Sequence, residues 1–228
     1  MRSVIAVMML TMAAAASAQP APPDVIVAAG EAVVMRAPDR AFVTVTVETR
    51  AKAPGDAQRI NAQAMTAVQQ RLDQARVPKD AVRTRGYELQ QEFDFPNGKR
   101  VPREFVARNA IEVRVDEVGR AGELLDIAVQ SGATATGGVR FDLRDREGAE
   151  REALRLAVAD ARARAEAAAT GAGRAIDRVI KVEDLRESGS PVPRPMLTMA
   201  RVADAPATPI EPGLIEIHAR VTLTAAMR

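Results

Sequence analysis

The sequence predicts an α+β fold in which helices pack on a largely antiparallel sheet. Two observations carry this prediction. Alternating, β-branched segments follow one another in pairs, which is typical of hairpins and therefore of antiparallel sheets. Between residues 41 and 145 the expected order is strand, helix, strand, strand, helix, strand, which is the split βαβ arrangement of ferredoxin-like folds. A further strand pair is expected at the C-terminus.

The first residues are predicted to be a targeting segment. Arg2 precedes an apolar run from Val4 to Ala16, and Ala16-Ser17-Ala18 has the small residues of a cleavage site. We therefore expect a signal peptide over residues 1–18 and a mature chain that begins near Gln19. The alternative is an uncleaved anchor, which is disfavoured because a membrane-spanning helix takes about 20 apolar residues.

Two strands are predicted next, over residues 25–36 and 41–51. The second alternates Val with Phe and Thr, so it has one apolar and one more polar face. Residues 37–40 read as a turn, and the two strands are therefore expected to pair as a hairpin. Gly30 inside the first strand predicts a bulge or a bend.

A helix and a long hairpin are expected to follow. The helix begins at Pro54 and continues to about residue 76, because apolar residues recur at helical spacing: Ala57, Ile60, Ala64, Val68, Leu72 and Ala75. The hairpin has arms at 82–95 and 103–116, and its tip contains the turn dipeptide Asn97-Gly98.

A second helix is predicted over about 117–130, and a strand over 138–145. The intervening residues are a loop, or a loop that runs into the strand. The longest helix follows, from about 146 to 170, with Asp145 as N-cap and Gly171 or Gly173 just past its end. It carries a stripe of small residues: Ala153, Ala157, Ala161, Ala165 and Ala168. The stripe favours a helix that lies flat on its own sheet over a seam between subunits.

The C-terminal strand pair encloses a Pro-rich stretch. We expect a strand at 175–187, a loop at 188–212 that carries six prolines, and a closing strand from 213 to about 225. The closing strand alternates strictly, so a slip of one residue would move Glu216 and Arg220 into the core and its register is well specified.

Composition excludes several classes of protein. The chain has no Cys, which rules out disulfides and catalysis by a thiol. Acidic and basic residues nearly balance at a net charge of +2, and aromatic residues make up 3% of the chain with no Trp, so nucleic-acid binding is not expected. No transmembrane helix is expected in the mature chain.

Few residues are candidates for chemistry. His218 is the single histidine, and a metal site around it would need further converging ligands, so a structural role is favoured. No nucleophile elbow or phosphate-binding loop is present, since Gly137-Gly138 and Gly171–Gly173 read as turn and helix-end glycines. The remaining candidates are charged groups and methionines. Glu183, Asp184 and Glu187 read as solvated charges in preference to a dyad, and Glu92 and Asp94 as partners of Arg100 and Arg103 across the hairpin tip. Met196 and Met199 are sites of reversible oxidation or of incidental composition, and incidental composition is favoured. No catalytic residue, cofactor-binding residue, metal ligand or cofactor is therefore predicted.

The chain resembles the SIMPL-domain family of exported bacterial proteins, often labelled periplasmic or outer-membrane immunogenic proteins. The resemblance runs in order through nearly all of the mature chain and is carried by segments such as GEAVVMRAPDRAFVTVTVETRA, ARNAIEVRVDEVGRAGELLDIAVQSGAT and TPIEPGLIEIHARVTL. It implies an α+β fold in a domain that spans residues 19–228, an envelope location and a tendency to self-associate. It also implies a link to oxidative-stress tolerance in some members, and no catalytic residues.

Three hypotheses for function follow. The leading one is a non-enzymatic exported envelope protein, periplasmic or associated with the outer membrane, that forms a homo-oligomer. The alternative is a monomeric periplasmic module that binds another envelope protein through the Pro-rich loop and the hairpin tip. A hydrolase is the least favoured, because no acid–base constellation is visible.

Overall fold

The computed structural model describes residues 24–185 and 208–228. The predicted signal peptide and residues 188–207 of the predicted loop lie outside the described residues. The described strands and helices are β1 (Val25–Arg36), β2 (Arg40–Ala51), α1 (Pro54–Gln74), β3 (Val82–Asp94), β4 (Val101–Val115), α2 (Ala121–Gln130), β5 (Ala135–Asp142), α3 (Arg146–Gly171), β6 (Ile176–Asp184) and β7 (Ile215–Met227). Single 3₁₀ turns precede β3, β4 and α2: Lys79–Ala81, Pro96–Gly98 and Val118–Arg120.

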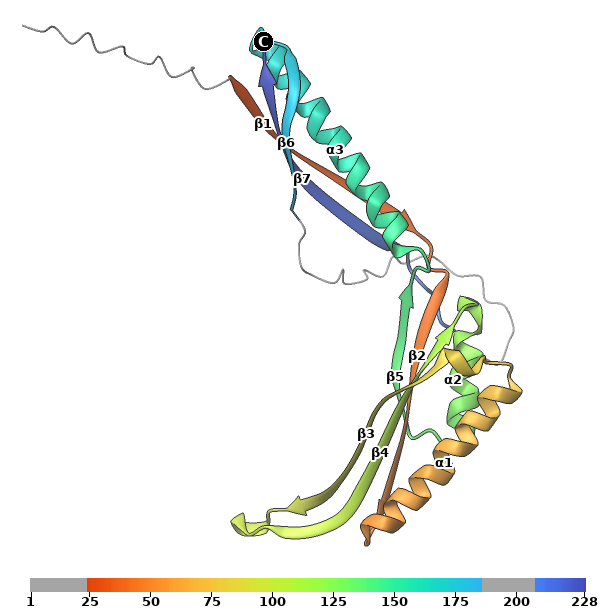
Figure 1. Cartoon of the computed structure of the whole chain (residues 1–228). Coiled ribbons are helices and arrows are strands. Elements are labelled where there is room, and N and C mark those ends of the chain that lie inside the picture. The colour runs from red at the N-terminus through yellow and green to blue at the C-terminus, as the bar shows by residue number, and fades with distance from the viewer. Residues whose placement is uncertain (1–23, 186–207) are drawn as a thin grey trace, which may run out of the picture.

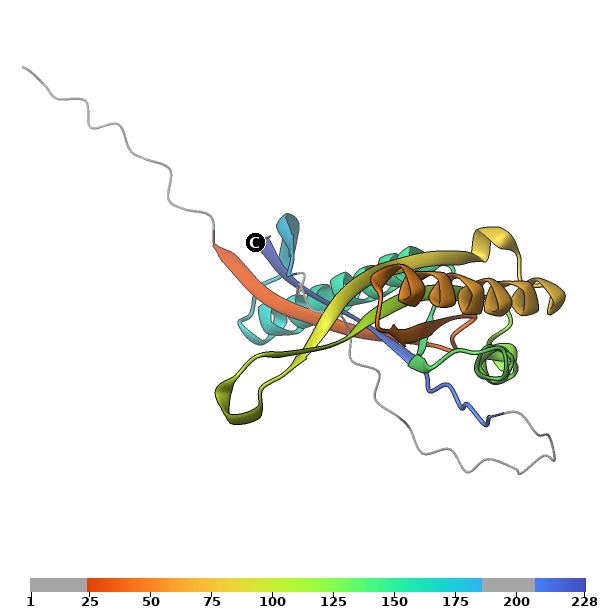
Figure 2. The same ribbon diagram turned by 90° about the horizontal axis from the view of Figure 1, so that it is seen from below.

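The strands form two antiparallel sheets, which lie at opposite ends of an elongated molecule (Figure 1). The fold is therefore α+β, as predicted. The larger sheet has the order β3-β4-β2-β5, which is the order of a ferredoxin-like split βαβ fold. The hairpin of β3 and β4 extends beyond the helices and curves away from them (Figure 2).

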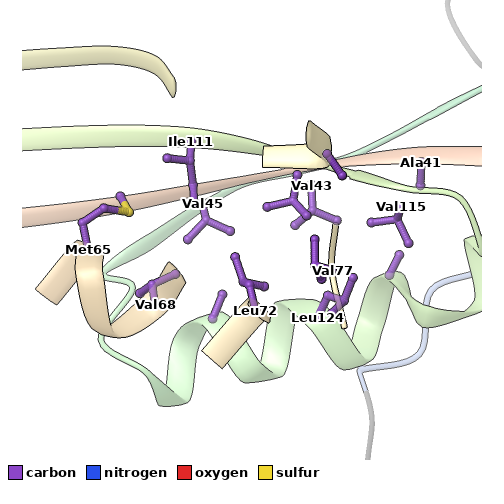
Figure 3. Close-up of a cluster of buried hydrophobic side chains, with 14 of the residues drawn as sticks. Ala41, Val43, Val45, Met65, Val68, Leu72, Val77, Ile111, Val115 and Leu124 are labelled. Atoms are coloured by element: carbon purple, nitrogen blue, oxygen red, sulfur yellow. The ribbon is translucent and has the colours of Figure 1, made fainter. Parts of the chain in front are cut away.

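One face of the larger sheet is covered by α1 and α2. Valines of β2, together with Ile111 of β4, meet Val68 and Leu72 of α1 and Leu124 of α2 in the main core (Figure 3). The alternation of β2 explains this arrangement, because every second side chain points toward the helices. The helical spacing was misread at one point: Ile60 is 38% exposed, whereas Asn61 is fully buried.

The smaller sheet has the order β1-β7-β6, and α3 lies against β1 and β7. The predicted C-terminal strand pair of β6 and β7 is confirmed. The predicted hairpin of β1 with β2 is wrong, because β1 pairs with β7 without a break from Val25 opposite Ala226 to Arg36 opposite Ile215. Residues 37–39 do not fold the chain back but carry it from one sheet to the other. Alternation identified both strands, but it does not specify a partner.

Gly30 is needed for close packing and does not form a bulge. The register of β1 against β7 has no irregularity there, and a Cβ at Gly30 would lie 2.2 Å from the carbonyl oxygen of Ala157 and 2.3 Å from the amide nitrogen of Ala161. The alanine stripe of α3 therefore packs directly against the backbone of β1. The helix lies flat on its own sheet, which is the interpretation that the sequence favoured. The stripe ends at Ala169 instead of Ala168, which is exposed.

The ends of the helices and strands differ from the predictions by a few residues. Asp145 caps α3 by accepting a hydrogen bond of 2.8 Å from the amide of Gly148, and Gly173 follows the helix with a φ of 71°. The loop after α2 runs into strand β5, which begins at Ala135. Within residues 24–185 and 208–228, no helix is long and apolar enough to cross a membrane.

Candidate functional site

The predicted site residues are not brought together by the fold. His218 lies on the face of β7 that points away from α3, is 60% exposed, and contacts Glu216 at 3.2 Å. Across the described part of the chain, no group of three or more His, Cys, Asp or Glu side chains could hold a metal ion. Glu183 pairs with Lys181 at 2.7 Å, which fits the predicted role of a solvated charge. Glu187, Met196 and Met199 lie outside the described residues.

The hairpin tip forms only part of the predicted ion pairing. Asp94 pairs with Arg103 at 3.5 Å, whereas Glu92 reaches back to Arg50 of β2 at 2.5 Å. Arg100 stacks over the ring of Phe93, 3.5 Å from its centroid. The tip also exposes apolar side chains, since Phe95 is 65% exposed. Such a tip offers an aromatic and cationic surface for contact and no acid–base pair.

The uncovered face of the larger sheet carries a network of ion pairs. Glu48 of β2 accepts hydrogen bonds from Arg108 at 2.6 Å and from Arg50 at 2.9 Å. These bonds, from Arg108 first, hold the pKa of Glu48 below its ordinary value. The network pairs its carboxylates with arginines, and the lowered pKa of Glu48 is the opposite of the raised pKa that general acid catalysis uses.

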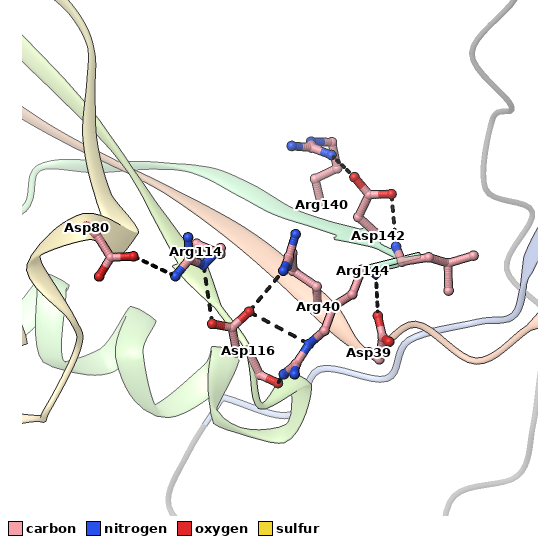
Figure 4. Close-up of polar contacts among 9 residues, drawn as sticks. Asp39, Arg40, Asp80, Arg114, Asp116, Arg140, Asp142 and Arg144 are labelled. Atoms are coloured by element: carbon pink, nitrogen blue, oxygen red, sulfur yellow. Dashed lines mark hydrogen bonds and ion pairs between the residues drawn. The ribbon is translucent and has the colours of Figure 1, made fainter. Parts of the chain in front are cut away.

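A second ionic cluster lies where the two sheets meet (Figure 4). Asp116 accepts hydrogen bonds of 3.2 Å from both Arg40 and Arg114, and Arg114 also reaches Asp80 at 3.0 Å. Burial acts to raise the pKa of Asp116, but the neighbouring arginines outweigh it and lower that pKa. Arg144, which follows β5, donates to the carbonyl oxygen of Asp116 at 2.5 Å. The cluster therefore ties the end of β4 to the connection between the sheets.

Among the described residues, no helix or strand covers the face of the smaller sheet opposite α3. Every second residue of β1 points outward there, and this outer row is exposed along its whole length: Val25, Val27, Ala29, Glu31, Val33 and Met35. Val27 is the most exposed apolar member at 62%. Outward side chains of the neighbouring strands include Glu216, His218 and Arg220 of β7 and Lys181 and Glu183 of β6. The face therefore combines an apolar row with a balanced set of charges.

A groove of about 540 Å³ lies between the C-terminal half of α3 and β6. Its charged walls are internally paired, since Arg162 contacts Glu166 at 2.9 Å and Arg178 contacts Asp177 at 3.1 Å. Thr170 is the hydroxyl residue in its lining, and its hydroxyl donates to the carbonyl oxygen of Glu166. The groove thus offers no free nucleophile beside a base.

A comparison with known protein families identifies the family to which the chain belongs. A family model named SIMPL, described as a protein of unknown function (DUF541), matches residues 26–225, which include every described strand and helix apart from their outermost residues. The chain belongs to the SIMPL family. The family and the α+β fold that the resemblance of the sequence implied are thus both confirmed.

Two curated proteins are similar to this SIMPL-family chain. Each is named "26 kDa periplasmic immunogenic protein", one from Brucella abortus (strain S19) and one from Brucella melitensis biotype 1. Each is 27% identical over 201 residues, which cover 84% of this chain and 80% of the relative. The similarity thus extends over both sheets and is not confined to one of them.

Two polar contacts were not predicted. Asn61 of α1 is fully buried and donates hydrogen bonds to the carbonyl oxygens of Val47 at 2.8 Å and Ala107 at 2.9 Å. Asp126 of α2 accepts two hydrogen bonds from Thr208. Asn61 had a signal in the sequence, because it is a polar residue four positions from both Ala57 and Met65 on the buried helix face. Asp126 had none, since its partner is 82 residues away.

Proposed function

We propose that this protein is an exported, non-enzymatic periplasmic protein that self-associates through the uncovered face of its smaller sheet. The observation that carries the proposal is the outer row of β1, which exposes Val25 and Val27 at one end and Val33 and Met35 at the other, with Ala29 and Glu31 between them. Apolar residues scattered singly on a surface are ordinary, but several that share one row of a sheet face favour an interaction site.

The charges around this row support a second copy of the chain as the partner. On this face Glu31 pairs with Arg220 at 3.7 Å, and Glu183 pairs with Lys181 at 2.7 Å. A balanced face has no long-range preference for a strongly acidic or basic partner, and two such faces can pair without net repulsion. Uncovered sheet faces commonly pack on one another at a separation of about 10 Å.

The leader sequence, the names of the relatives and the dispersed positions of the candidate residues support an exported protein without catalytic activity. The leader over residues 1–18 has the pattern of a signal peptide, and the two Brucella relatives are named as periplasmic proteins. The predicted chemical candidates are dispersed over the fold, with His218 on β7 and the charged hairpin tip on the other sheet. Cleavage after Ala18 is tested by N-terminal sequencing of protein taken from the periplasm, where an intact Met1 would contradict it.

Self-association is tested by measuring mass. We expect light scattering of the chain that begins at Gln19 to give a defined mass above that of one copy, rising with concentration. Val27→Glu places a charge in the apolar row and is expected to weaken association by at least tenfold. Val129→Glu is the matched control, because Val129 is also exposed, at 54%, but lies on α2. A parent protein that stays monomeric, or equal masses for both variants, would contradict the proposal.

A second function is favoured by the hairpin tip. Phe95 and Val101 are 65% and 44% exposed at the end of an arm that extends beyond the helices. An arm of this kind suits a module that binds another envelope protein. A photo-crosslinker at Phe95 tests this function: a crosslink to a different protein, from a chain that remains monomeric, would favour it over self-association.

The most specific part of the proposal is a link to oxidative stress, which the exposure of Met35 supports. Met35 is 47% exposed in the outer row of β1, whereas Met65 is 3% exposed in the main core. Peroxide transfers an oxygen atom to an accessible methionine sulfur and leaves water, giving the sulfoxide. We expect mass spectrometry after mild peroxide treatment of dilute protein, in which the outer row is not covered by a second copy, to find Met35 oxidised well before Met65. Equal rates would contradict this exposure argument, and a Met35→Leu strain with unchanged peroxide survival would remove the link.

A further inference from the structure

Residues 208–210 lie against helix α2 of the larger sheet before the chain enters β7 of the smaller one. Three separate contacts hold them there, and each involves a different part of the segment. Thr208 makes the first: its amide donates to Asp126 Oδ2 at 3.0 Å, and its hydroxyl donates to Asp126 Oδ1 at 2.6 Å. One carboxylate thus receives both donors of a single residue, and these bonds lower the pKa of Asp126.

The second contact is a close approach of two backbones. A Cβ at Gly122 of α2 would lie 2.2 Å from the carbonyl oxygen of Thr208, so only glycine leaves room for the segment. Gly119, three residues earlier, has no heavy atom within 4 Å of the same position. Gly122 is therefore required because of the docked segment, whereas Gly119, in the turn before α2, is not restricted in this way.

The third contact is apolar. Ile210 is partly buried and packs against the main core of the larger sheet. The chain then continues through Glu211, Pro212 and Gly213 to β7, whose Ile215 and Ile217 belong to a core of the smaller sheet. A few residues of extended chain therefore have one end packed in each half of the molecule.

The other two connections between the sheets run side by side. Residues 37–39 link β1 to β2, residues 143–145 link β5 to α3, and the amide of Arg144 donates to Asp39 Oδ1 at 2.7 Å (Figure 4). Two adjacent connections hold a joint together but still permit it to bend, much as hinges between domains consist of a few residues. The segment docked on α2 is a third attachment between the two halves.

We propose that residues 208–210 are a latch that fixes the orientation of the smaller sheet relative to the larger one. The connections at 37–39 and 143–145 form the hinge, and the contacts with Asp126 and Gly122 prevent it from bending. Release of the latch leaves each sheet folded, because the buried residues of each sheet form their own clusters, but lets the two sheets change their relative angle about the joint, where Phe141 packs against a cluster of each. This inference does not depend on self-association and is tested on single copies of the chain.

The test measures a distance between the two halves. The chain has no Cys, so Gln70→Cys on α1 and Arg155→Cys on α3 place two spin labels at exposed positions without any other change. Double electron–electron resonance on dilute protein is expected to give a narrow distance distribution in this parent. Gly122→Ala and Asp126→Ala are expected to broaden it at least twofold, whereas the matched control Gly119→Ala leaves it narrow.

Hydrogen exchange completes the test. The amide of Thr208 is expected to be protected in the parent and in Gly119→Ala, and to lose most of that protection in Asp126→Ala. Thr208→Val serves as the milder variant if Gly122→Ala fails to fold. A distribution that stays narrow after Thr208 has lost its protection would overturn the proposal, because the segment would then be docked without setting the orientation. A broad distribution in the parent would overturn it as well.

Discussion

Single residues matter most in this protein where a polar or small side chain replaces the expected apolar one. Asn61 occupies a position that helical spacing assigns to the core, and it connects α1 to two neighbouring strands through the carbonyl oxygens of Val47 and Ala107. Periodicity predicted the buried face of α1 but assigned Ile60 to it. The hydrophobic pattern measures the average direction of a helix face, and it has no means of recognising a buried amide whose partners are distant in sequence.

Replacing Asn61 is therefore expected to destabilise the larger sheet. Asn61→Ala removes two buried hydrogen bonds and leaves a small cavity, which should lower the free energy of unfolding by about 1–3 kcal/mol. Gln63→Ala is the control, because Gln63 is exposed on the same helix and its change is expected to stay within about 0.5 kcal/mol. Urea denaturation measures both. Equal midpoints for the two variants would show that the Asn61 bonds contribute no net stability.

The Asp126–Thr208 contact predicts a pH dependence with a definite sign. The folded-state pKa of Asp126 is lowered by the two hydrogen bonds from Thr208, so their stabilisation is present above the ordinary pKa of Asp and is lost as pH falls through the lowered value. We expect the NMR shift of the Thr208 amide to stay constant at neutral pH and to titrate only below the ordinary range of Asp. Asp126→Asn should abolish this titration, and a midpoint at or above the ordinary range would contradict the contact.

At the scale of elements, alternation and helical spacing identified every described strand and main helix to within a few residues. They failed on pairing. β1 and β2 are adjacent in sequence and both alternate, but β1 finds its partner in β7 at the far end of the chain. Alternation records which side chains face a core, and it carries no information about which neighbouring strand supplies the hydrogen bonds. Gly30 was misread for the same reason, because its neighbour, α3, lies more than a hundred residues away.

Strand β7 allows a sharp test of one correct prediction, its register. Ile217 is 3% exposed and packs in the core beside the joint, whereas His218, the next residue, points to the uncovered face. Ile217→Asp would bury an unpaired carboxylate and is expected to cost several kcal/mol, a large part of a typical stability of about 5–15 kcal/mol. His218→Asp changes the same strand outside the core and should lower the melting temperature only slightly. Thermal unfolding in which both variants melt together would contradict the register.

For the whole molecule, the segment that forms the larger sheet is inserted in the sequence between the first strand of the smaller sheet and its last two strands. The larger sheet and its two helices come from the continuous stretch between Arg40 and Asp142, whereas the smaller sheet needs both ends of the described chain, in β1 and β7. The two ends of the inserted stretch lie close together, as the hydrogen bond from the amide of Arg144 to Asp39 shows. The sequence predicted the βαββαβ order of the insert, but not that the flanking segments build a separate sheet, since that sheet depends on the most distant contacts in the chain.

This topology predicts that residues 38–144 fold alone. The fragment contains all four strands of the larger sheet, both of its helices and the whole buried part of the main core, and its contacts are far less distant in sequence than the pairing of β1 with β7. It loses the latch, and the partial burial of Ile210 is worth about 1–2 kcal/mol. We therefore expect dispersed NMR spectra and a cooperative thermal transition at a temperature below that of the full chain. Leu72→Asp in the same fragment should abolish both, because Leu72 is 1% exposed in the core. A fragment that is as disordered as this variant would mean that the larger sheet cannot fold until β1 and β7 have paired around it.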